Sequence, residues 1–184
     1  MVNIKMNKFN KLFEKLISEA QENNVSQEEI VELTKDQVEA YLSQGKYWTE
    51  NKRGVDEIVQ ITKTFYTPNM HYLAIIVDEK IAAISTYLKM EENNKNIIFL
   101  NEVVSFKKGC GKTIIDASLD LDADLIFFNA NWEAGETLLN YYRKNFGPLI
   151  EYKNENGHVF FIKTNNFNEE ELEEFKKKNP YIKM

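Results

Sequence analysis

The sequence has few of the residues that cross-link a chain or bind metals. Its 184 residues include one cysteine, Cys110, which excludes an internal disulfide and fits a reducing compartment. With only His71 and His158 beside that cysteine, a Cys/His zinc site has too few ligands, and we predict no metal. No apolar run approaches the roughly 20 residues that span a bilayer, and the start lacks the apolar stretch of a signal peptide. We therefore predict a cytoplasmic protein with no membrane partner.

Positively charged residues are fewer than negatively charged ones. The chain has 23 Lys and Arg against 29 Asp and Glu, for a net charge of −6, which argues against general affinity for nucleic acid. Hydrophobic residues make up 43% of the sequence, so a chain of this length can bury a substantial core. Strand and helix patterns alternate along the chain. Together these features predict an α/β protein.

Three segments can be distinguished along the chain. Residues 1–24 predict an N-terminal amphipathic helix or leader, because apolar residues recur at three- and four-residue intervals up to Asn23-Asn24. Residues 25–164 hold the alternating pattern of the predicted domain. Residues 165–184 predict a charged C-terminal helix or tail, and its acidic-then-basic pattern suggests an exposed helix with little core of its own.

Local signals predict the elements before residue 97. Residues 30–33 fit a strand or a helical turn, 36–43 and 55–66 fit helices, and Ser26–Glu29 and Thr34–Gln37 resemble helix-capping boxes. Residues 72–77 and 80–90 predict a β-hairpin that turns at Asp78-Glu79.

Residues 97–113 carry the strongest functional pattern. An apolar, β-branched run from Ile97 to Val104 predicts a strand, and a helical pattern opens at Lys112. Between them lie two glycines and three lysines: Gly109, Gly111, Lys107, Lys108 and Lys112. A strand, a glycine turn and a helix together point backbone N–H groups and the positive end of a helix dipole at a phosphate. We therefore predict a phosphate-bearing ligand here, although solvated lysines in an ordinary connection would give the same pattern.

A nucleotide-binding P-loop is one interpretation of this turn. Gly111-Lys112-Thr113 matches the end of the pattern G-x-x-x-x-G-K-[ST], but Phe106 stands where its first glycine belongs. The next apolar run ends in Asn129, where a P-loop enzyme would carry an acidic partner for magnesium. We rank this interpretation third.

Residues 97–163 resemble the GNAT N-acetyltransferase superfamily. In that family a fourth strand leads into a Q/R-x-x-G-x-G/A loop, and Lys107 to Lys112 take that place here, with Phe106 where Gln or Arg would stand. The following segments match the family order of helix, strand, helix with an aromatic Tyr-x-x-x-Gly-Phe end, and two strands: 113–121, 124–129, 133–144, 149–153 and 158–163. The resemblance implies a mixed, twisted sheet of six to seven strands, flanked by helices and split between strands four and five.

The resemblance implies acetyl-CoA as cosubstrate and a primary amine as acceptor. Its pyrophosphate would meet the loop from Lys107 through Lys108, Gly109, Cys110, Gly111 and Lys112 to Thr113. Its pantetheine arm would pair with the main chain near Val103 and Val104, and Asn129 and Asn131 could bond that arm or cap their own loop. The general acid would be a tyrosine on the helix after strand five, and Glu102 could relay the amine proton or be an ordinary strand residue.

Two neighbouring tyrosines compete for the role of acid. Tyr141 is in register if Asn145 replaces the usual glycine in the left-handed conformation, and Tyr142 is nearer if Gly147 is that residue. We place Tyr141 slightly ahead. Cys110 could be activated by the nearby lysines, but steric filling between two glycines is the simpler interpretation.

Further residues carry weaker hypotheses. Trp48, Trp132, Tyr66 and His71 could line an acceptor pocket or be packed in the core. Ile17-Ser18-Glu19-Ala20 resembles a prohead-protease cleavage sequence of tailed phages, which would make the chain a virion protein, but a four-residue pattern is common by chance and a plain terminal helix is the favoured interpretation. The alternative function is a non-catalytic CoA-binding module on the same fold. The acceptor and the oligomeric state stay open.

Overall fold

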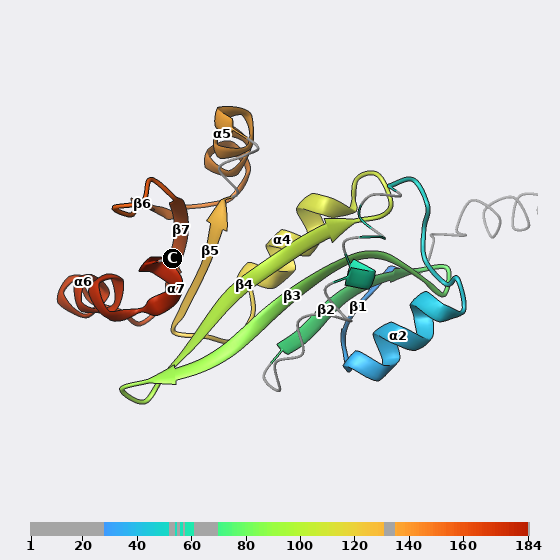
Figure 1. Ribbon diagram of the computed structural model, residues 1–184, viewed down its shortest axis with the longest axis horizontal. Coiled ribbons are helices and arrows are strands. Elements are labelled where there is room, and N and C mark those ends of the chain that lie inside the picture. The colour runs from blue at the N-terminus through green and yellow to red at the C-terminus, as the bar shows by residue number, and fades with distance from the viewer. Residues whose placement is uncertain are drawn as a thin grey trace, which may run out of the picture.

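The structure is a computed structural model that describes residues 28–51, 54, 56, 58–60, 70–130 and 135–183. Within these residues seven strands form one sheet in the order β1-β2-β3-β4-β5-β7-β6 (Figure 1). The strands are β1 (Glu28–Leu33), β2 (Met70–Val77), β3 (Lys80–Glu92), β4 (Lys95–Ser105), β5 (Leu125–Ala130), β6 (Ile150–Lys153) and β7 (Val159–Thr164). The helices are α2 (Lys35–Ser43), α4 (Cys110–Leu119), α5 (Gly135–Asn145), α6 (Glu169–Lys178) and α7 (Pro180–Lys183). The predicted fold class is confirmed.

The sheet is mixed in strand direction. β4 and β5 run parallel, and the other neighbouring strands of the described sheet are antiparallel. A parallel pair needs a crossover connection, and α4 supplies it between β4 and β5. The β4–β5 pair therefore joins two antiparallel parts, β1 to β4 on one side and β5, β7 and β6 on the other.

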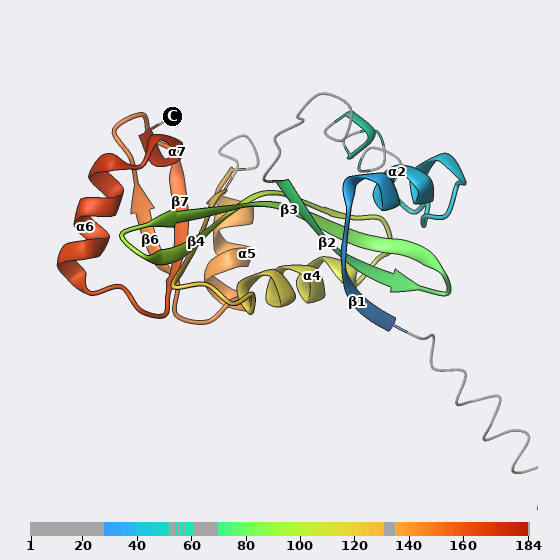
Figure 2. The same ribbon diagram turned by 90° about the horizontal axis from the view of Figure 1, so that it is seen from below.

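Helices cover both faces of the sheet. α4 and α5 lie on one face, and α2, α6 and α7 lie on the other (Figure 2). Side chains of β4 alternate between these faces: Ile98 and Leu100 join the cluster under α4, whereas Ile97 and Phe99 join the cluster under α6. A run that is apolar at consecutive positions is expected for a strand buried on both faces. The continuous apolar segment of the sequence thus follows from the two helical layers.

The predicted elements before β4 are present. β1 is the strand that residues 30–33 suggested, and the capping box of Thr34 and Gln37 starts α2. The β2–β3 hairpin turns at Asp78 and Glu79, whose φ angles of 51° and 60° are the left-handed values of a tight hairpin turn. The helix predicted over 55–66 is seen at residues 54, 56 and 58–60.

Three local predictions are wrong. Glu29 lies in β1, so it does not complete a capping box with Ser26. α4 begins at Cys110 rather than Lys112, because Gly109 already takes the left-handed conformation that turns the chain into the helix. α6 is not a helix with little core: its residues Leu172 and Phe175 are buried against β5 and β7. Only these two apolar residues stand among the acidic and basic blocks, so the sequence pattern did not indicate a buried face.

Several sequence predictions lie outside the described residues. These are the N-terminal helix with its Asn23-Asn24 boundary, the cleavage-like sequence at residues 17–20, and the residues Tyr66, Asn131 and Trp132. Among the described helices, none is long and apolar enough to cross a bilayer.

Candidate functional site

β4 and β5 form a fork. They pair from Ile97–Leu125 to Leu100–Phe128, and no later residue of the described β4 pairs with β5. Figure 1 shows the two strands spreading apart toward their C-terminal ends. Asn101, the next residue of β4, has no backbone ladder partner on β3 either, because the register there passes from Leu100–Tyr87 to Glu102–Thr86, whereas its side-chain amide contacts β3 at Thr86 Oγ1. A β-bulge bends its strand, and the bend at Asn101 is what separates β4 from β5.

The open arms of the fork hold several of the predicted residues. Glu102 and Val103 are half-buried on the β4 arm, and Asn129 is exposed on the β5 arm. Val104 is different: its side chain is buried in the cluster under α2. Val104 can therefore offer a ligand its main chain, but its side chain belongs to the core.

The β4–α4 turn follows the open arm directly. Gly109 has a φ of 93° and is the N-cap of α4. Because a helix leaves its first N–H groups without intrahelical acceptors, these groups can bind an anion. In the described part of the chain, the amides of Gly111 and Lys112 donate to no protein acceptor. A Cβ added to Gly109 would have no neighbour within 4 Å, whereas one added to Gly111 would be in ordinary contact with Ser105 Cβ at 3.6 Å, so the turn is open to a ligand beside Gly109.

The first part of the turn is used by the protein itself. The amides of Phe106 and Lys107 both donate to the carbonyl oxygen of Ala82 on β3, at 2.9 Å. The Phe106 side chain is fully buried with Ile84 and Val104. Phe106 therefore anchors the turn to the sheet. This role accounts for an apolar residue at a position where the GNAT family has Gln or Arg. The amide of Cys110 donates to the carbonyl oxygen of Lys107 at 3.3 Å, so the helix amides left for a ligand are those of Gly111 and Lys112.

The three lysines of the turn have different surroundings. The Lys107 ammonium lies 4.2 Å from the centroid of the Trp48 ring. The Lys112 ammonium forms an ion pair with Asp116 one helical turn away. The amide of Lys108 donates to a carboxylate oxygen of Glu50 at 2.8 Å. Lys107 is thus held on an aromatic face, whereas the side chain of Lys108 is exposed.

Cys110 is a buried thiol at the start of α4. Burial raises its pKa, the negative charges of Glu28 and Glu50 raise it further, and Lys107 opposes them. A raised pKa keeps the sulfur protonated and poorly nucleophilic. These surroundings support the interpretation that Cys110 fills space between the two glycines.

The two candidate tyrosines of α5 face different surroundings. Tyr141 is 38% exposed, whereas Tyr142 is half-buried, with its ring centroid 5.0 Å from that of Phe128 and 5.4 Å from that of Phe161. Burial raises the pKa of Tyr142 to about 12, with smaller contributions from Tyr141 and from the negative charge of Glu102. A contribution from Glu102 means that the phenol of Tyr142 lies within electrostatic reach of the β4 arm.

The expected left-handed residue at the end of α5 is not found. Neither Asn145 nor Gly147 has a positive φ, and Asn145 is the last residue of the helix. Its side-chain amide instead donates to the carbonyl oxygen of Tyr141 at 2.8 Å, so that it caps the helix through its side chain. Both registers, the one on Asn145 that favoured Tyr141 and the one on Gly147 that favoured Tyr142, therefore lack their left-handed residue.

Two of the residues suggested for an acceptor pocket lie elsewhere. Trp48 donates its indole N–H to the carbonyl oxygen of Val77 and packs beside the β4–α4 turn. His71 lies on β2, two strands from the fork, where its Nδ1 is 2.8 Å from a Glu32 oxygen and its ring stacks on Tyr87. These contacts stabilise the sheet and give neither residue a place in the fork.

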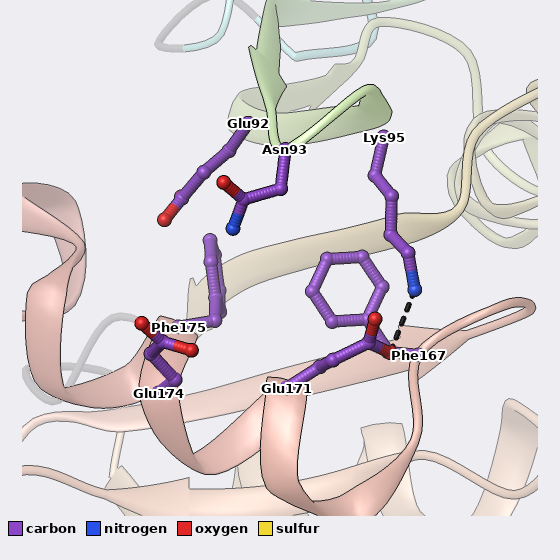
Figure 3. Close-up of a pocket in the computed structure, with 7 residues that line it drawn as sticks. All are labelled: Glu92, Asn93, Lys95, Phe167, Glu171, Glu174 and Phe175. Atoms are coloured by element: carbon purple, nitrogen blue, oxygen red, sulfur yellow. Dashed lines mark hydrogen bonds and ion pairs between the residues drawn. The ribbon is translucent and has the colours of Figure 1, made fainter.

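A small pocket lies where α6 meets the β3–β4 turn, at the end of β4 opposite to the open arms of the fork (Figure 3). Its lining residues are Glu92, Asn93, Lys95, Phe167, Glu171, Glu174 and Phe175. The Lys95 ammonium enters this pocket, lying 2.6 Å from Glu171 and 4.6 Å from the centroid of the Phe167 ring. The pocket is thus occupied by a side chain of the protein, which ties α6 to the sheet.

Sequence reasoning missed Glu50 and Asn51, which hold the turn from the other side, and it named Trp48 only for an acceptor pocket. Glu50, Asn51 and Trp48 contact Lys108, Ser105 and Lys107. They lie in the connection after α2, where no periodic pattern or motif marks them. The two segments are more than 50 residues apart in the sequence. Nothing in their residue types indicates that they come into contact.

Comparison with known proteins gives structural but not sequence relatives. No family model matches the chain, and no curated protein matches it in sequence. One similar structure is an aminoglycoside acetyltransferase from an uncultured soil metagenomic sample, with 13% identity, 69% of this chain and 95% of that chain covered, and a TM-score of 0.46. Another is the Campylobacter jejuni N-acetyltransferase PseH in complex with acetyl coenzyme A, with 11% identity, coverages of 74% and 98%, and a TM-score of 0.47.

A third similar structure is a protein from Desulfovibrio desulfuricans that is assigned to the GNAT family of acetyltransferases. It shares 10% identity, with coverages of 74% and 98% and a TM-score of 0.45. Acetyltransferases of this family are thus among the structures that the chain is similar to, as the sequence resemblance indicated. At identities of 10–13%, this similarity is one of fold.

Proposed function

We propose that the chain is an acyltransferase that moves an acetyl group from acetyl-CoA to a primary amine by direct attack. One observation carries the proposal: the open arm of the β4–β5 fork runs straight into a turn whose helix amides are available to an anion. A CoA molecule has a pyrophosphate, which suits the turn, and an extended pantetheine arm, which suits the fork. The fork and the turn therefore suit a single ligand that reaches from α4 to the bulge at Asn101.

The main chain would hold the ligand at both ends. The pantetheine arm would pair with the open edge of β4 at Val103 and Val104, because no protein strand among those described pairs with that edge. The pyrophosphate would accept hydrogen bonds from Gly111 and Lys112, at the positive end of the α4 dipole. The Lys108 ammonium would add an exposed positive charge. Asn129 stands on the opposite arm, where its side-chain amide can bond the pantetheine.

Acetyl-CoA supplies an activated thioester, and the protein supplies proton transfer. Glu102 would accept the proton that the amine loses, since a lysine-type amine has a reference pKa near 10.4 and must be neutral to attack. As the new C–N bond forms and the C–S bond breaks, the sulfur receives the bonding electron pair. Tyr142 would donate its phenolic proton to that sulfur, and the proton that the nitrogen loses as it becomes an amide restores the phenol. With a pKa of about 12, this phenol is protonated at neutral pH.

Tyr142 is preferred to Tyr141 for a geometric reason. Both lie on α5, but Tyr142 is directed toward the aromatic residues of β5 and β7 and is reached by the charge of Glu102. An acid and a base on the two sides of the fork would bracket a thioester lying between them. Tyr141 is more exposed and packs against Phe146.

Calorimetry with acetyl-CoA and with magnesium-ATP tests the binding part of the proposal. We expect acetyl-CoA to bind and Lys108→Ala to weaken that binding and reduce its dependence on salt. The matched variant Lys107→Ala should have a smaller effect, because the Lys107 ammonium lies on the Trp48 ring. Binding of magnesium-ATP without any response to acetyl-CoA would contradict the proposal and favour the P-loop interpretation.

A CoA-binding module without turnover is the second candidate. The observation in its favour is that Phe106, a buried apolar residue, stands where the GNAT family has Gln or Arg. Release of free CoA thiol, followed over a panel of small amines, peptides with free N-termini and lysine peptides, separates the two candidates. Binding of acetyl-CoA without thiol release on any acceptor would support the module.

A further inference from the structure

A strap formed by residues 46–51 crosses the outside of the β4–α4 turn. The strap leaves α2 and leads to the helical residues that begin at 54. Its backbone is tied to β3, because Trp48 N donates to Ile81 O and Ile81 N donates to Lys46 O, both at 3.0 Å. The strap is thus a fixed part of the sheet edge and lies beside the proposed phosphate site.

Three side chains of the strap contact successive parts of the turn. Asn51 donates its side-chain amide to Ser105 O at 3.0 Å, and the Trp48 ring faces the Lys107 ammonium. Glu50 reaches furthest, because its carboxylate accepts the backbone N–H of Lys108 at 2.8 Å. Asn51 also accepts the amide of Gly54 at 3.1 Å, so the same residue caps the next helix.

The contact of Glu50 is chemically that of a bound anion. A carboxylate that accepts a backbone N–H beside a helix N-terminus makes the kind of charge-assisted hydrogen bond that a phosphate makes there. Its negative charge also extends into the first turn of α4, where it helps to raise the pKa of Cys110. Glu50 therefore lowers the positive potential of the turn that an anionic ligand needs.

We infer that Glu50 is an internal competitor for anionic ligands at the β4–α4 turn, and that its carboxylate leaves the Lys108 amide so that the phosphates of an acyl-CoA can take this amide together with those of Gly111 and Lys112. This inference rests on the proposed function for the identity of the ligand. Binding then exchanges a carboxylate of the chain for the ligand's phosphates.

The experiment compares Glu50→Gln with Glu28→Gln by calorimetry at constant ionic strength. Glutamine keeps the shape of the side chain and an oxygen that can accept the Lys108 N–H, so the fold should be preserved. Glu28 is the matched control: it also acts on Cys110 through its charge, but it lies on β1 and does not contact Lys108. We expect Glu50→Gln to tighten acetyl-CoA binding about fivefold or more, the lower range of a typical coupling, and Glu28→Gln to change it much less.

Inorganic pyrophosphate is the second probe, because it lacks the acyl arm. Tighter pyrophosphate binding by Glu50→Gln, without acetyl-CoA binding in any variant, would support the competitor and refute the proposed function. Equal acetyl-CoA affinity of the wild type, Glu50→Gln and Glu28→Gln would leave the proposed function standing and overturn the competitor. Equal tightening by both variants would also overturn it, since total charge alone would then explain the effect. Absence of binding of either probe to every variant would refute both.

Discussion

The two halves of β4 contrast within a single strand. Residues 97–100 pair with β3 on one side and β5 on the other, and their side chains are packed in the clusters under α4 and α6. Residues 102–105 pair with β3 alone, and Glu102, Val103 and Ser105 are only half-buried. The first half holds the sheet together and the second half leaves an edge free. One unpaired residue, Asn101, separates a structural half from a half that is available to a ligand.

Each half is fixed by a different kind of interaction at its end. The closed half begins at a polar lock, in which Asn96 N donates to Asp124 Oδ2 at 2.7 Å and Asp124 N donates to Asn96 O at 2.8 Å. The open half ends at the turn, where Phe106 is buried and the strap contacts Ser105 and Lys108. The fork is thus held at its base and at its tip, so its gap does not depend on a ligand.

The largest expected effect comes from blocking the open half at its tip. Gly111→Trp should remove acetyl-CoA binding, a loss of at least about 100-fold in affinity, which is about 2.7 kcal/mol. The Cβ itself fits, since it would lie 3.6 Å from Ser105 Cβ, but the indole would cover the free amides. Calorimetry measures the change.

Gly147→Trp is the control for this substitution, because a Cβ at Gly147 has no neighbour within 4 Å and the residue lies after α5. Unchanged acetyl-CoA affinity of Gly111→Trp would show that the ligand does not use the turn.

The next effect separates the two tyrosines beside the fork. Tyr142→Phe should slow turnover by roughly 10²–10⁴-fold with little change in acetyl-CoA affinity, because it removes a proton donor and keeps the ring contacts. Tyr141→Phe should stay close to the wild type. Steady-state rates and affinities, measured with an acceptor found in the amine panel, test this prediction.

The reverse order of the two tyrosine variants would return the role of acid to Tyr141. Wild-type rates for both variants would place the proton source elsewhere, in solvent or in the acceptor itself.

A third prediction compares how much the closed and open halves of β4 contribute to stability. Leu100→Ala, in the closed half, should lower the free energy of unfolding by about 2–5 kcal/mol, since Leu100 is 3% exposed. Val103→Ala, in the open half, should cost about 1 kcal/mol, because the side chain is half-buried. Chemical denaturation of the full chain measures both values. Equal losses would show that the open half carries as much of the core as the closed half.

The smallest effect concerns the lock at the base of the fork. Hydrogen bonds from the Asn166 side chain and from the Asn96 backbone lower the pKa of Asp124 below 3.8. A folded-state pKa below the unfolded one gives stability that is fully present above the unfolded pKa and is lost as pH falls through the folded pKa. We therefore expect stability to decline below about pH 4, and Asp124→Asn to make that decline shallower.

Thermal unfolding at pH 7 and near pH 3 compares Asp124→Asn with Asp122→Asn, an exposed neighbour. A decline as steep in Asp124→Asn as in the wild type would show that other carboxylates control acid stability.

Much of the fold could be predicted from the sequence, because local signals fix it. The polar pair Asp78-Glu79 between two apolar runs predicted the hairpin, and the capping residues Thr34 and Gln37 predicted the start of α2. The glycine turn before α4 was also found by its composition. These features depend on residues within a few positions of each other, so sequence patterns contain them.

The failures concern contacts between distant segments. An apolar run predicted β4, and the polar pair Asn101-Glu102 interrupts that run. Two polar residues inside a strand do not by themselves mark the end of its pairing with a distant strand, so the place where pairing with β5 stops could not be predicted. Glu50 and Lys108 are joined by tertiary structure alone. At α5 the motif was aligned on a left-handed residue, whereas Asn145 caps the helix with its side chain and leaves the register open. The choice between Tyr141 and Tyr142 therefore needed the packing of β5 and β7.

The parallel pairing of β4 with β5 also bears on how the chain folds. β2, β3 and β4 meet through short turns, so their contacts are local and can form early. Ile97 can meet Leu125 only after the whole α4 crossover has been ordered, which carries a larger loss of chain entropy. We expect the β2–β3–β4 meander to form first and the fork to close late. A folding intermediate would then hold half of a sheet and no gap for a ligand, so ligand binding can report completion of the fold.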